Sequence, residues 1–172
     1  MNQKEQIAFG VQFFESNNWK PFPFQLKTWK HYLKGYNGIV NAATGSGKTY
    51  SLIVPIMIEF LSKYKDQDRD SLPTNNGLQA IWLTPIKALA KEIQISGQEA
   101  AAAMGIDWRI EIRTGDTSSS QRTKQRKKPP EILITTPESL HLLLASNQYQ
   151  EIFKNLKVVV ADEWHELVGS KR

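Results

Sequence analysis

One segment decides the fold of this chain: Ala42-Ala43-Thr44-Gly45-Ser46-Gly47-Lys48-Thr49. It fits the phosphate-binding loop G-x-x-x-x-G-K-[ST], with Ala42 in place of the first glycine. Gly45 and Gly47 can adopt positive φ, which turns successive backbone N–H groups toward a phosphate. The alternative, a glycine-rich surface turn, is disfavoured because one apolar segment precedes the motif and another follows it. The pattern therefore predicts a nucleotide-binding loop between a strand and a helix.

Each residue type in this loop has a chemical reason. Lys48 would contact the β- and γ-phosphates of ATP, and the Thr49 hydroxyl would hold Mg²⁺. A helix that begins near Lys48 adds the positive end of its dipole. The rest of the loop would contact the nucleotide mainly through its backbone: Ala43, Thr44, Gly45, Ser46 and Gly47.

Composition limits the class of protein. The chain has 172 residues, 40% of them hydrophobic and 23% charged, which fits one globular domain. It contains no cysteine, so a disulfide framework or a thiolate zinc site is excluded. The N-terminus has no signal-peptide pattern, and no run of eighteen apolar residues occurs, so we expect a cytoplasmic location and no membrane contact. The formal charge of +5 weakly favours an anionic partner.

Apolar segments of strand length alternate with segments of helical periodicity along the chain. Helical crossovers of this length predict a mostly parallel sheet with helices on both faces, and a ligand beyond the carboxyl ends of the strands. The expected helices are 6–16, a second one from the Pro21–Gln25 segment to Gly35, 49–61, 84–104, 117–128 and 137–145. The expected strands are 38–43, 78–83, 108–113, 131–135 and 156–161.

A second group of candidate residues follows the last of these strands. Asp162 and Glu163 come directly after the apolar run Lys157–Ala161. Phosphoryl transfer to water needs one carboxylate for Mg²⁺ and another that orients or deprotonates the water. Asp162 suits the first role and Glu163 the second. The alternative is an acidic pair that caps the following helix.

These motifs carry a family resemblance. Asp162-Glu163-Trp164-His165 resembles the DExH box of superfamily-two helicases, and 43–49 resembles their motif I. Thr84–Ala90 is similar to motif Ia, Thr136–Leu140 to motif Ib, and Pro21–Gln25 to the Q motif. Trp164 within the box, the segment Glu166–Arg172 and the segment Arg113–Asp116 narrow the resemblance to the large helicase-related (Lhr-like) family, ligase-associated branch.

The resemblance implies a RecA-like P-loop NTPase domain of an ATP-driven DNA helicase or translocase with a role in DNA repair. Residues 1–172 would form its first RecA-like domain, with helices and the Q-motif-like segment in 1–36 and the P-loop core in 38–172. The family's next strand carries a Ser-Ala-Thr motif and lies between the phosphate-loop strand and the Asp-Glu strand. That strand would come after Arg172, so the fold is truncated after the Asp-Glu-Trp-His strand and an empty slot should separate 38–43 from 157–161.

The resemblance also implies roles for particular residues. Gln25 would read the adenine edge, since its amide both donates and accepts, and Phe22 would lie beside it. His165 would couple the nucleotide state to DNA. The nucleic-acid contacts would be sequence-independent and come from Thr84, Pro85, Lys87, Arg113, Thr114, Gly115, Thr136, Pro137, Glu138 and Ser139. Two points stay open. Thr84 and Thr136 could be plain helix caps instead of phosphate contacts. The basic run 122–128 is either a solvated face, which we favour, or a DNA contact.

Three other functions remain compatible with the sequence. One is an RNA-remodelling helicase of the same superfamily, and another is a P-loop phosphotransferase that acts on a small molecule. The third is a nucleotide- and nucleic-acid-binding module without turnover. The resemblance places the arginine finger in a second RecA-like domain of the full-length chain, so we expect the isolated chain to hydrolyse little ATP.

Overall fold

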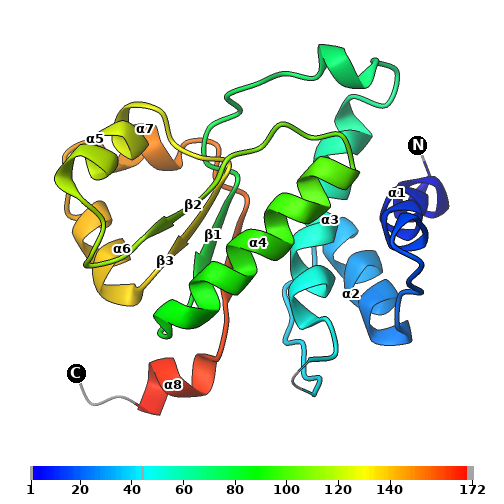
Figure 1. Ribbon diagram of the computed structural model, residues 1–172, viewed down its shortest axis with the longest axis horizontal. Coiled ribbons are helices and arrows are strands. Elements are labelled where there is room, and N and C mark those ends of the chain that lie inside the picture. The colour runs from blue at the N-terminus through cyan, green and yellow to red at the C-terminus, as the bar shows by residue number, and fades with distance from the viewer. Residues whose placement is uncertain (1, 44, 170–172) are drawn as a thin grey trace. The chain divides into compact units, whose positions relative to one another are not determined.

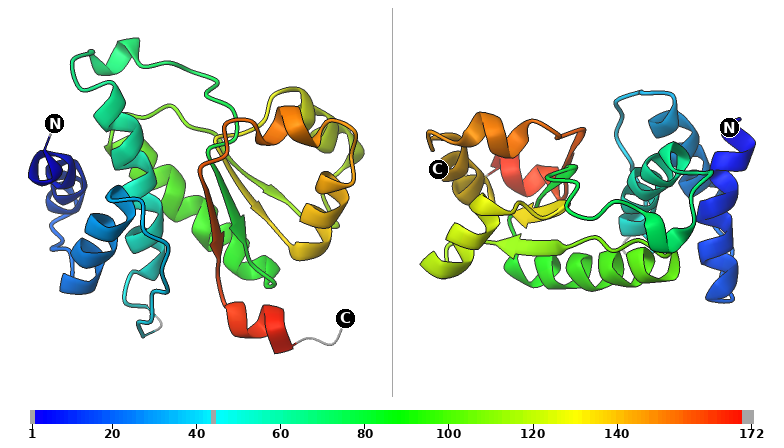
Figure 2. Two further views of the ribbon diagram at one scale, coloured as in Figure 1. Left: turned by 180° about the vertical axis from the view of Figure 1, so that it is seen from behind. Right: turned by 90° about the horizontal axis from the view of Figure 1, so that it is seen from above.

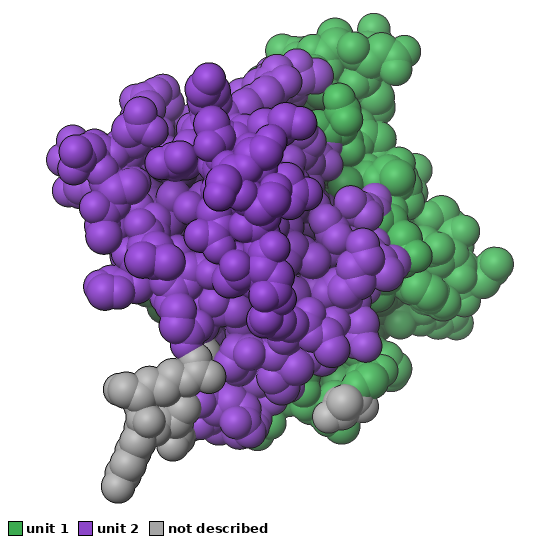
Figure 3. Space-filling model, turned by 60° about the vertical axis from the view of Figure 1, so that its left-hand side comes forward, with its two compact units in different colours: residues 1–72, 99–107 green, residues 73–98, 108–172 purple. Residues whose placement is uncertain are grey.

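The computed structural model describes residues 2–43 and 45–169. These residues fall into two compact units, coloured separately in Figure 3. Unit 1 comprises residues 1–72 and 99–107, and unit 2 comprises residues 73–98 and 108–172. The helices α1, α2 and α3, labelled in Figure 1, belong to the first unit, and the sheet belongs to the second. In the part of the chain that the structure describes, no helix is long and apolar enough to cross a membrane.

Unit 1 is helical. Its elements are α1 (Gln3–Ser16), α2 (Pro23–Leu33), α3 (Lys48–Lys63), the 3₁₀ turn η1 (Arg69–Ser71) and the end of α4 from Glu99 onward. A capping box between Asn2 and Glu5 starts α1, and Pro23 occupies the first turn of α2, where its missing N–H costs nothing. The helix α3 is buried on nearly all sides, as its continuous apolar sequence predicts.

The helices α2 and α3 are joined by three hydrogen bonds from one face of α2. The Gln25 amide donates to the carbonyl of Gly47 at 2.9 Å, and the Trp29 indole donates to the carbonyl of Tyr50 at 3.2 Å. The Tyr32 hydroxyl donates to the Glu59 carboxylate at 2.8 Å. Burial and Glu59 raise the pKa of Tyr32 well above its usual range, so this hydroxyl keeps its proton.

Unit 2 is built on a four-stranded parallel sheet. Its strands are β1 (Ala80–Leu83), β2 (Ile110–Arg113), β3 (Ile132–Thr135) and β4 (Val158–Ala161), in the spatial order β2-β3-β1-β4. The register places Leu83 beside Thr135 and Ala161, and Arg113 beside Thr135, so the carboxyl ends of the strands are aligned. The helices are α4 (Lys87–Ala103, to Gln98 in this unit), α5 (Ser119–Lys127), α6 (Pro137–Leu144), α7 (Tyr149–Phe153) and α8 (Trp164–Gly169).

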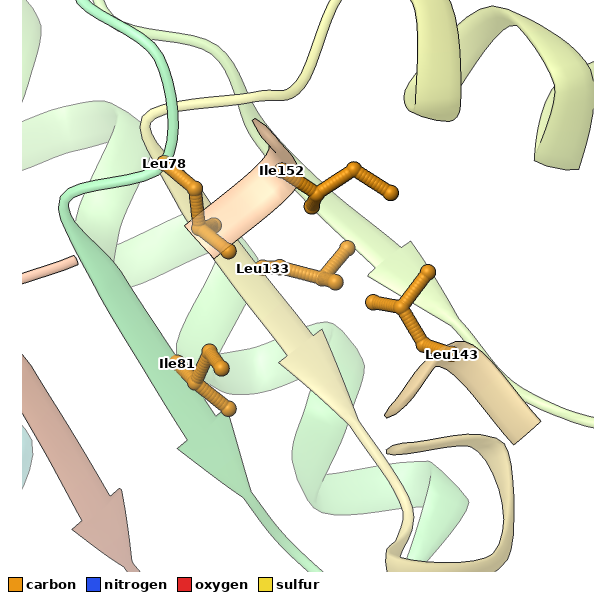
Figure 4. Packing of buried hydrophobic residues seen from close by; sticks show 5 residues of the cluster. All are labelled: Leu78, Ile81, Leu133, Leu143 and Ile152. Atoms are coloured by element: carbon orange, nitrogen blue, oxygen red, sulfur yellow. The ribbon is translucent and has the colours of Figure 1, made fainter. Parts of the chain in front are cut away.

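Helices cover both faces of this sheet. In the right-hand view of Figure 2, α4 lies on one face and α6 and α7 lie on the other. Figure 4 shows the core beneath α6 and α7, where sheet residues pack against Leu143 and Ile152; its members are Leu78, Ile81, Leu133, Leu143 and Ile152. The observed α/β architecture is the fold class that the alternating sequence pattern predicts.

A buried carboxylate fixes the amino-terminal ends of the strands. Glu131 precedes β3 and is fully buried. Its oxygens accept hydrogen bonds from the backbone N–H groups of Asn76 at 3.0 Å and Arg109 at 2.8 Å. The Arg109 guanidinium lies 3.7 Å from the same carboxylate. Because a buried charge is tolerated only when it is paired and hydrogen-bonded, this arrangement ties the starts of β1 and β2 to β3.

Most expected elements are confirmed, but the strand expected at 38–43 is wrong. This segment is not a strand, and Ile39 is 83% exposed. The physical reason is the lack of a ladder partner, since unit 1 contains no strand among its described residues to satisfy an extended backbone. The short helix α7 was not expected, because its five residues are too few to show a helical period.

The strand β4 forms one edge of the sheet, on the side where the empty slot was expected. Within the described residues β4 pairs with β1 alone, and 39–41 is not its partner. Val159 is 52% exposed on this edge strand. Of the two strands that were expected to flank the slot, only β4 forms, and the slot itself stays a prediction.

Candidate nucleotide and nucleic-acid sites

The phosphate loop has the backbone that the sequence predicts at its glycines. Gly45 has φ of 76° and Gly47 has φ of 78°, both in the left-handed region. Gly47 is also the N-cap of α3, so the helix begins at Lys48. The Lys48 ammonium donates to the carbonyl of Ala42 at 2.9 Å, across the loop. The lysine is thus held at the loop that it is expected to serve, whereas Thr44 lies outside the described residues.

Gln25 braces this loop. It is only 1% exposed, and both atoms of its amide are engaged inside the chain. Its Oε1 accepts from the backbone N–H of Phe22 at 2.8 Å, and its Nε2 donates to the carbonyl of Gly47. Each amide atom keeps one unused N–H or lone pair, so what contact with adenine would require is access to this buried side chain. Phe22, by contrast, is exposed and stacks on Phe24 with ring centroids 6.1 Å apart.

Trp29 is a further residue of α2 that supports the start of α3. Its ring is fully buried, and its indole N–H satisfies the carbonyl of Tyr50 in the first turn of α3. Gly10 of α1 allows this packing, because a Cβ at that position would lie 2.8 Å from the Trp29 ring. The i, i+4 spacing of Gln25 and Trp29, followed by Tyr32, places all three donors on one side of α2 and is the signal that could have identified the brace.

In unit 2, the candidate residues follow the carboxyl ends of the strands. The strand order places Asp162 first, then Thr84, Thr136 and Thr114 along this edge. Neighbouring strands lie about 4.8 Å apart, so the four positions form one row. These four positions therefore share the edge of the sheet at which the sequence predicts a ligand.

The acidic pair after β4 is held by its neighbours. Asp162 accepts from the Trp82 indole at 3.3 Å through Oδ2, and from the Glu163 N–H at 3.0 Å through Oδ1. Glu163 has φ of 47°, a left-handed conformation unusual for a side-chain-bearing residue. His165 lies between two carboxylates, with Nδ1 3.5 Å from Glu163 and Nε2 3.6 Å from Glu166. No sequence pattern indicated that Trp82, on the neighbouring strand, would orient Asp162.

The two threonines that follow β1 and β3 have different local roles. Thr84 is buried, and its hydroxyl accepts weakly from the N–H of Ile86 at 3.4 Å, while α4 begins later, at Lys87. Thr136 is the N-cap of α6, and its hydroxyl bonds to both the N–H and the hydroxyl of Ser139. The helix-cap interpretation therefore describes Thr136 in this structure, and Pro137 occupies the first turn. Glu138 is exposed at the same helix start.

The loop after β2 is shaped by a residue that we expected on a solvated face. Arg122 donates from Nε to the carbonyl of Thr117 at 2.8 Å, and from Nη2 to the carbonyls of Thr114 and Gly115 at 3.1 and 2.8 Å. Asp116, in the same loop, forms an exposed ion pair with Lys87. The solvated-face interpretation is therefore wrong for Arg122, because its guanidinium bonds to three loop carbonyls. Residues 126–128 are exposed, which leaves both interpretations of the basic run open for them. The loop also borders a shallow polar cavity of about 520 Å³.

The donor chemistry suits a nucleotide better than a resident metal. Among the described residues, no group of three or more His, Cys, Asp or Glu side chains could hold a metal ion. The loop instead offers backbone N–H groups at the start of α3 and one lysine ammonium, which are donors for phosphate. A divalent cation would then depend on nucleotide oxygens together with few protein ligands, as Mg²⁺ commonly does. Thr49 and Asp162 are the side chains of the right type.

Comparison with known proteins identifies the family. A model of the DEAD/DEAH box helicase family matches residues 22–172. The chain belongs to this family. The ATP-dependent helicase Lhr-Core of Methanothermobacter thermautotrophicus is 36% identical over 148 residues, which is 81% of this chain and 17% of that protein. The Lhr helicase/uracil glycosylase of Escherichia coli is 32% identical over 163 residues, 89% of this chain and 10% of that protein.

A solved structure supports the same assignment. The Mycobacterium smegmatis helicase Lhr, bound to ssDNA and AMP-PNP, superposes with a TM-score of 0.80 and 28% identity. The match covers 95% of this chain and 21% of that one. The RecA-like fold and the similarity to Lhr helicases are thereby confirmed, while the ligase-associated branch remains a prediction. The chain spans roughly one fifth or less of the length of these relatives.

Proposed function

We propose that this chain is the ATP-binding and DNA-binding part of an ATP-dependent DNA helicase or translocase of the Lhr type. The observation that supports this most directly is the phosphate loop, with two left-handed glycines and Lys48 held across it at the start of α3. The relative of known structure binds AMP-PNP and ssDNA, ligands that fit such a loop and a basic chain. A role in DNA repair, and a second RecA-like domain as partner, belong to the same proposal.

The proposed roles follow from the chemistry of each side chain. Lys48 would exchange its bond to Ala42 for the β- and γ-phosphates, which attract a cation more strongly than a carbonyl does. Thr49 and Asp162 would hold Mg²⁺, which supplies charge neutralisation between the phosphates when bound. Glu163 would orient or deprotonate the attacking water, and His165 beside it would couple that step to the DNA contacts. Ala43, Gly45, Ser46 and Gly47 would contact the nucleotide through the loop backbone, with Gln25 and Phe22 on its adenine side.

The proposed DNA contacts lie along the row of strand ends in unit 2. Thr84, Thr136 and Thr114 are successive positions of that row, and Lys87 adds an exposed ammonium. Contacts of this kind bind the phosphate backbone and carry no sequence information. The complete set that we propose is Thr84, Pro85, Lys87, Arg113, Thr114, Gly115, Thr136, Pro137, Glu138 and Ser139.

Nucleotide binding to residues 1–172 tests the first half of the proposal. A fluorescent ATP analogue should bind the wild-type chain, and Lys48→Ala should weaken binding at least about tenfold, since hydrogen bonds to charged groups contribute about 1.5–3 kcal/mol. Lys20→Ala, at an exposed position of the same unit, is the matched control and should bind as the wild type does. Equal affinities for Lys48→Ala and the wild type would contradict the proposed site.

Nucleic-acid binding tests the second half. Fluorescence anisotropy with labelled dT and rU oligonucleotides of equal length should give tighter binding to dT. Both affinities should fall with added salt, because phosphate contacts release counterions. Tighter binding to rU would favour the RNA-remodelling alternative. No binding to either oligonucleotide at low salt would contradict the nucleic-acid part while leaving the nucleotide part standing.

A further inference from the structure

We propose that Arg113, Arg122 and Arg126 form a binding site for one phosphate group of a nucleic-acid strand. The site lies where β2 ends and α5 runs beside it. This inference rests on the proposed function, and it assigns the outermost phosphate contact to three guanidinium groups. Two of these residues, Arg122 and Arg126, belong to no motif that the sequence singled out as a contact.

The first observation is a buried arginine without a counter-ion. Arg113 is 7% exposed, and its Nη1 is buried without a hydrogen-bond partner. Its guanidinium forms no ion pair with any residue that the structure describes. An arginine cannot give up its charge, so it cannot escape this cost by losing a proton. A fold retains such a group at a price in stability, which favours a functional reason for it.

The second observation is that the neighbouring charges are positive. Burial lowers the pKa of Arg113, and the cations Arg122 and Arg126 lower it further. Arg122 uses Nε and Nη2 on the loop carbonyls, which leaves the two N–H groups of Nη1 for a ligand. Arg126 is exposed, and its one hydrogen bond to another described residue is long, 3.4 Å from Nη2 to Thr123. Arg122 and Arg126 therefore add positive charge around the buried Arg113, and a bound anion would offset it.

The chain's own nearby acids do not supply that anion. Glu111, two residues before Arg113 on β2, forms no ion pair with it. Asp116, the carboxylate of the loop after β2, is engaged with Lys87. A phosphate oxygen pair matches the planar fork of a guanidinium, and several arginines can share one phosphate group. Arg126, as the exposed member, would make the first contact, and the buried Arg113 would add charge from beneath.

A strand phosphate fits this place better than the phosphate of a free nucleotide. The site lies beside Thr114, which is the last position in the row of strand ends. Beyond it, the exposed side chains of Lys124, Lys127 and Lys128 continue the positive surface along α5. A run of cations in line with one phosphate site suits a polymer of phosphates.

Arg113→Met tests the proposal with two readouts, and a structural role for Arg113 would move the first of them, the melting temperature, in the opposite direction. Without ligand, the variant should melt at least about 2 °C higher than the wild type, because an unpaired buried charge is removed. Its affinity for a labelled dT oligonucleotide should fall about 10- to 100-fold, the range expected for lost charged hydrogen bonds. A lower melting temperature would overturn the proposal, because it would make Arg113 a structural residue.

Arg126→Gln provides a second test at an exposed position, where folding is not at risk. The slope of log affinity against log salt should become less steep by about 0.7, the value for one phosphate contact in a single strand. Lys4→Gln, exposed on α1, removes the same charge from unit 1 and should leave the slope unchanged. An unchanged slope in Arg126→Gln, with normal binding by the wild type, would overturn this site alone. Absence of wild-type binding would instead contradict the proposed function.

AMP-PNP binding shows whether the phosphate belongs to a nucleic-acid strand or to a free nucleotide. Binding of AMP-PNP should be the same in Arg113→Met, Arg126→Gln and the wild type. A loss of AMP-PNP affinity in either variant would mean that the arginines serve a nucleotide phosphate, which would refute the assignment to a strand.

Discussion

Replacing Gln25 with alanine distinguishes two roles of this residue in nucleotide binding: holding the phosphate loop in place, or contacting the adenine edge. The structure shows an amide that is 1% exposed and bonded at both ends, to Phe22 N–H at 2.8 Å and to Gly47 carbonyl at 2.9 Å. Each bond contributes about 0.5–1.5 kcal/mol net, so their loss should destabilise the fold by about 2 kcal/mol. For a chain of this size that corresponds to a melting temperature lower by roughly 4–8 °C.

The functional readout is the affinity for ATP and for GTP, measured in parallel. If Gln25 acts by holding the loop, both affinities should fall by the same factor, since the two nucleotides present identical phosphates to the loop. Gln25→Glu should behave alike, because it keeps an acceptor for Phe22 but places a carboxylate oxygen against the Gly47 carbonyl. Gln12→Ala, exposed on α1, is the control and should change neither stability nor affinity.

One result would refute this reasoning. It is a Gln25→Ala variant that melts within about 1 °C of the wild type, loses affinity for ATP and keeps its affinity for GTP. That outcome would mean that the bonds seen in the structure contribute little and that the amide reads the adenine edge.

Four further predictions follow from the same structure. In the longer enzyme, Glu163→Gln should bind AMP-PNP as the wild type does but lose ATP hydrolysis, and wild-type turnover would remove Glu163 from its role. Residues 1–172 alone should release almost no phosphate from ATP even with DNA, because an arginine supplied from elsewhere contributes about 10³–10⁵ in rate; robust DNA-stimulated release would contradict this. Gly10→Ala should lower stability by up to about 2 kcal/mol, because crowding costs about 1–3 kcal/mol and alanine returns about 1 kcal/mol of helix propensity. The crowding arises because the new Cβ would meet the Trp29 ring at 2.8 Å, whereas Gly38→Ala, with nothing within 4 Å, should melt as the wild type does. Val159→Lys, on the exposed edge of β4, should reduce light scattering on standing, and increased scattering would show that this edge does not drive association.

The sequence by itself determined the local chemistry. A glycine that must adopt positive φ, a lysine at a helix start and a carboxylate after a buried strand are properties of short segments, so the phosphate loop and Asp162-Glu163 could be located by pattern. The alternation of strands and helices likewise determined that the sheet of unit 2 is parallel, because a helix between two strands carries the chain back to start the next strand in the same direction. The positions of β1, β2, β3 and β4 followed from their apolar runs.

Only the tertiary structure decided which residues act on those motifs from a distance. Hydrogen bonds from Gln25 to Gly47, from Trp82 to Asp162 and from Arg122 to Thr114 join positions whose side-chain directions no local pattern fixes. The tertiary structure also decided the conformation of the segment 38–43, for which its apolar residues had predicted a strand. A helix satisfies its backbone within itself, but a strand exists only beside a partner, and whether that partner is present is a property of the whole fold.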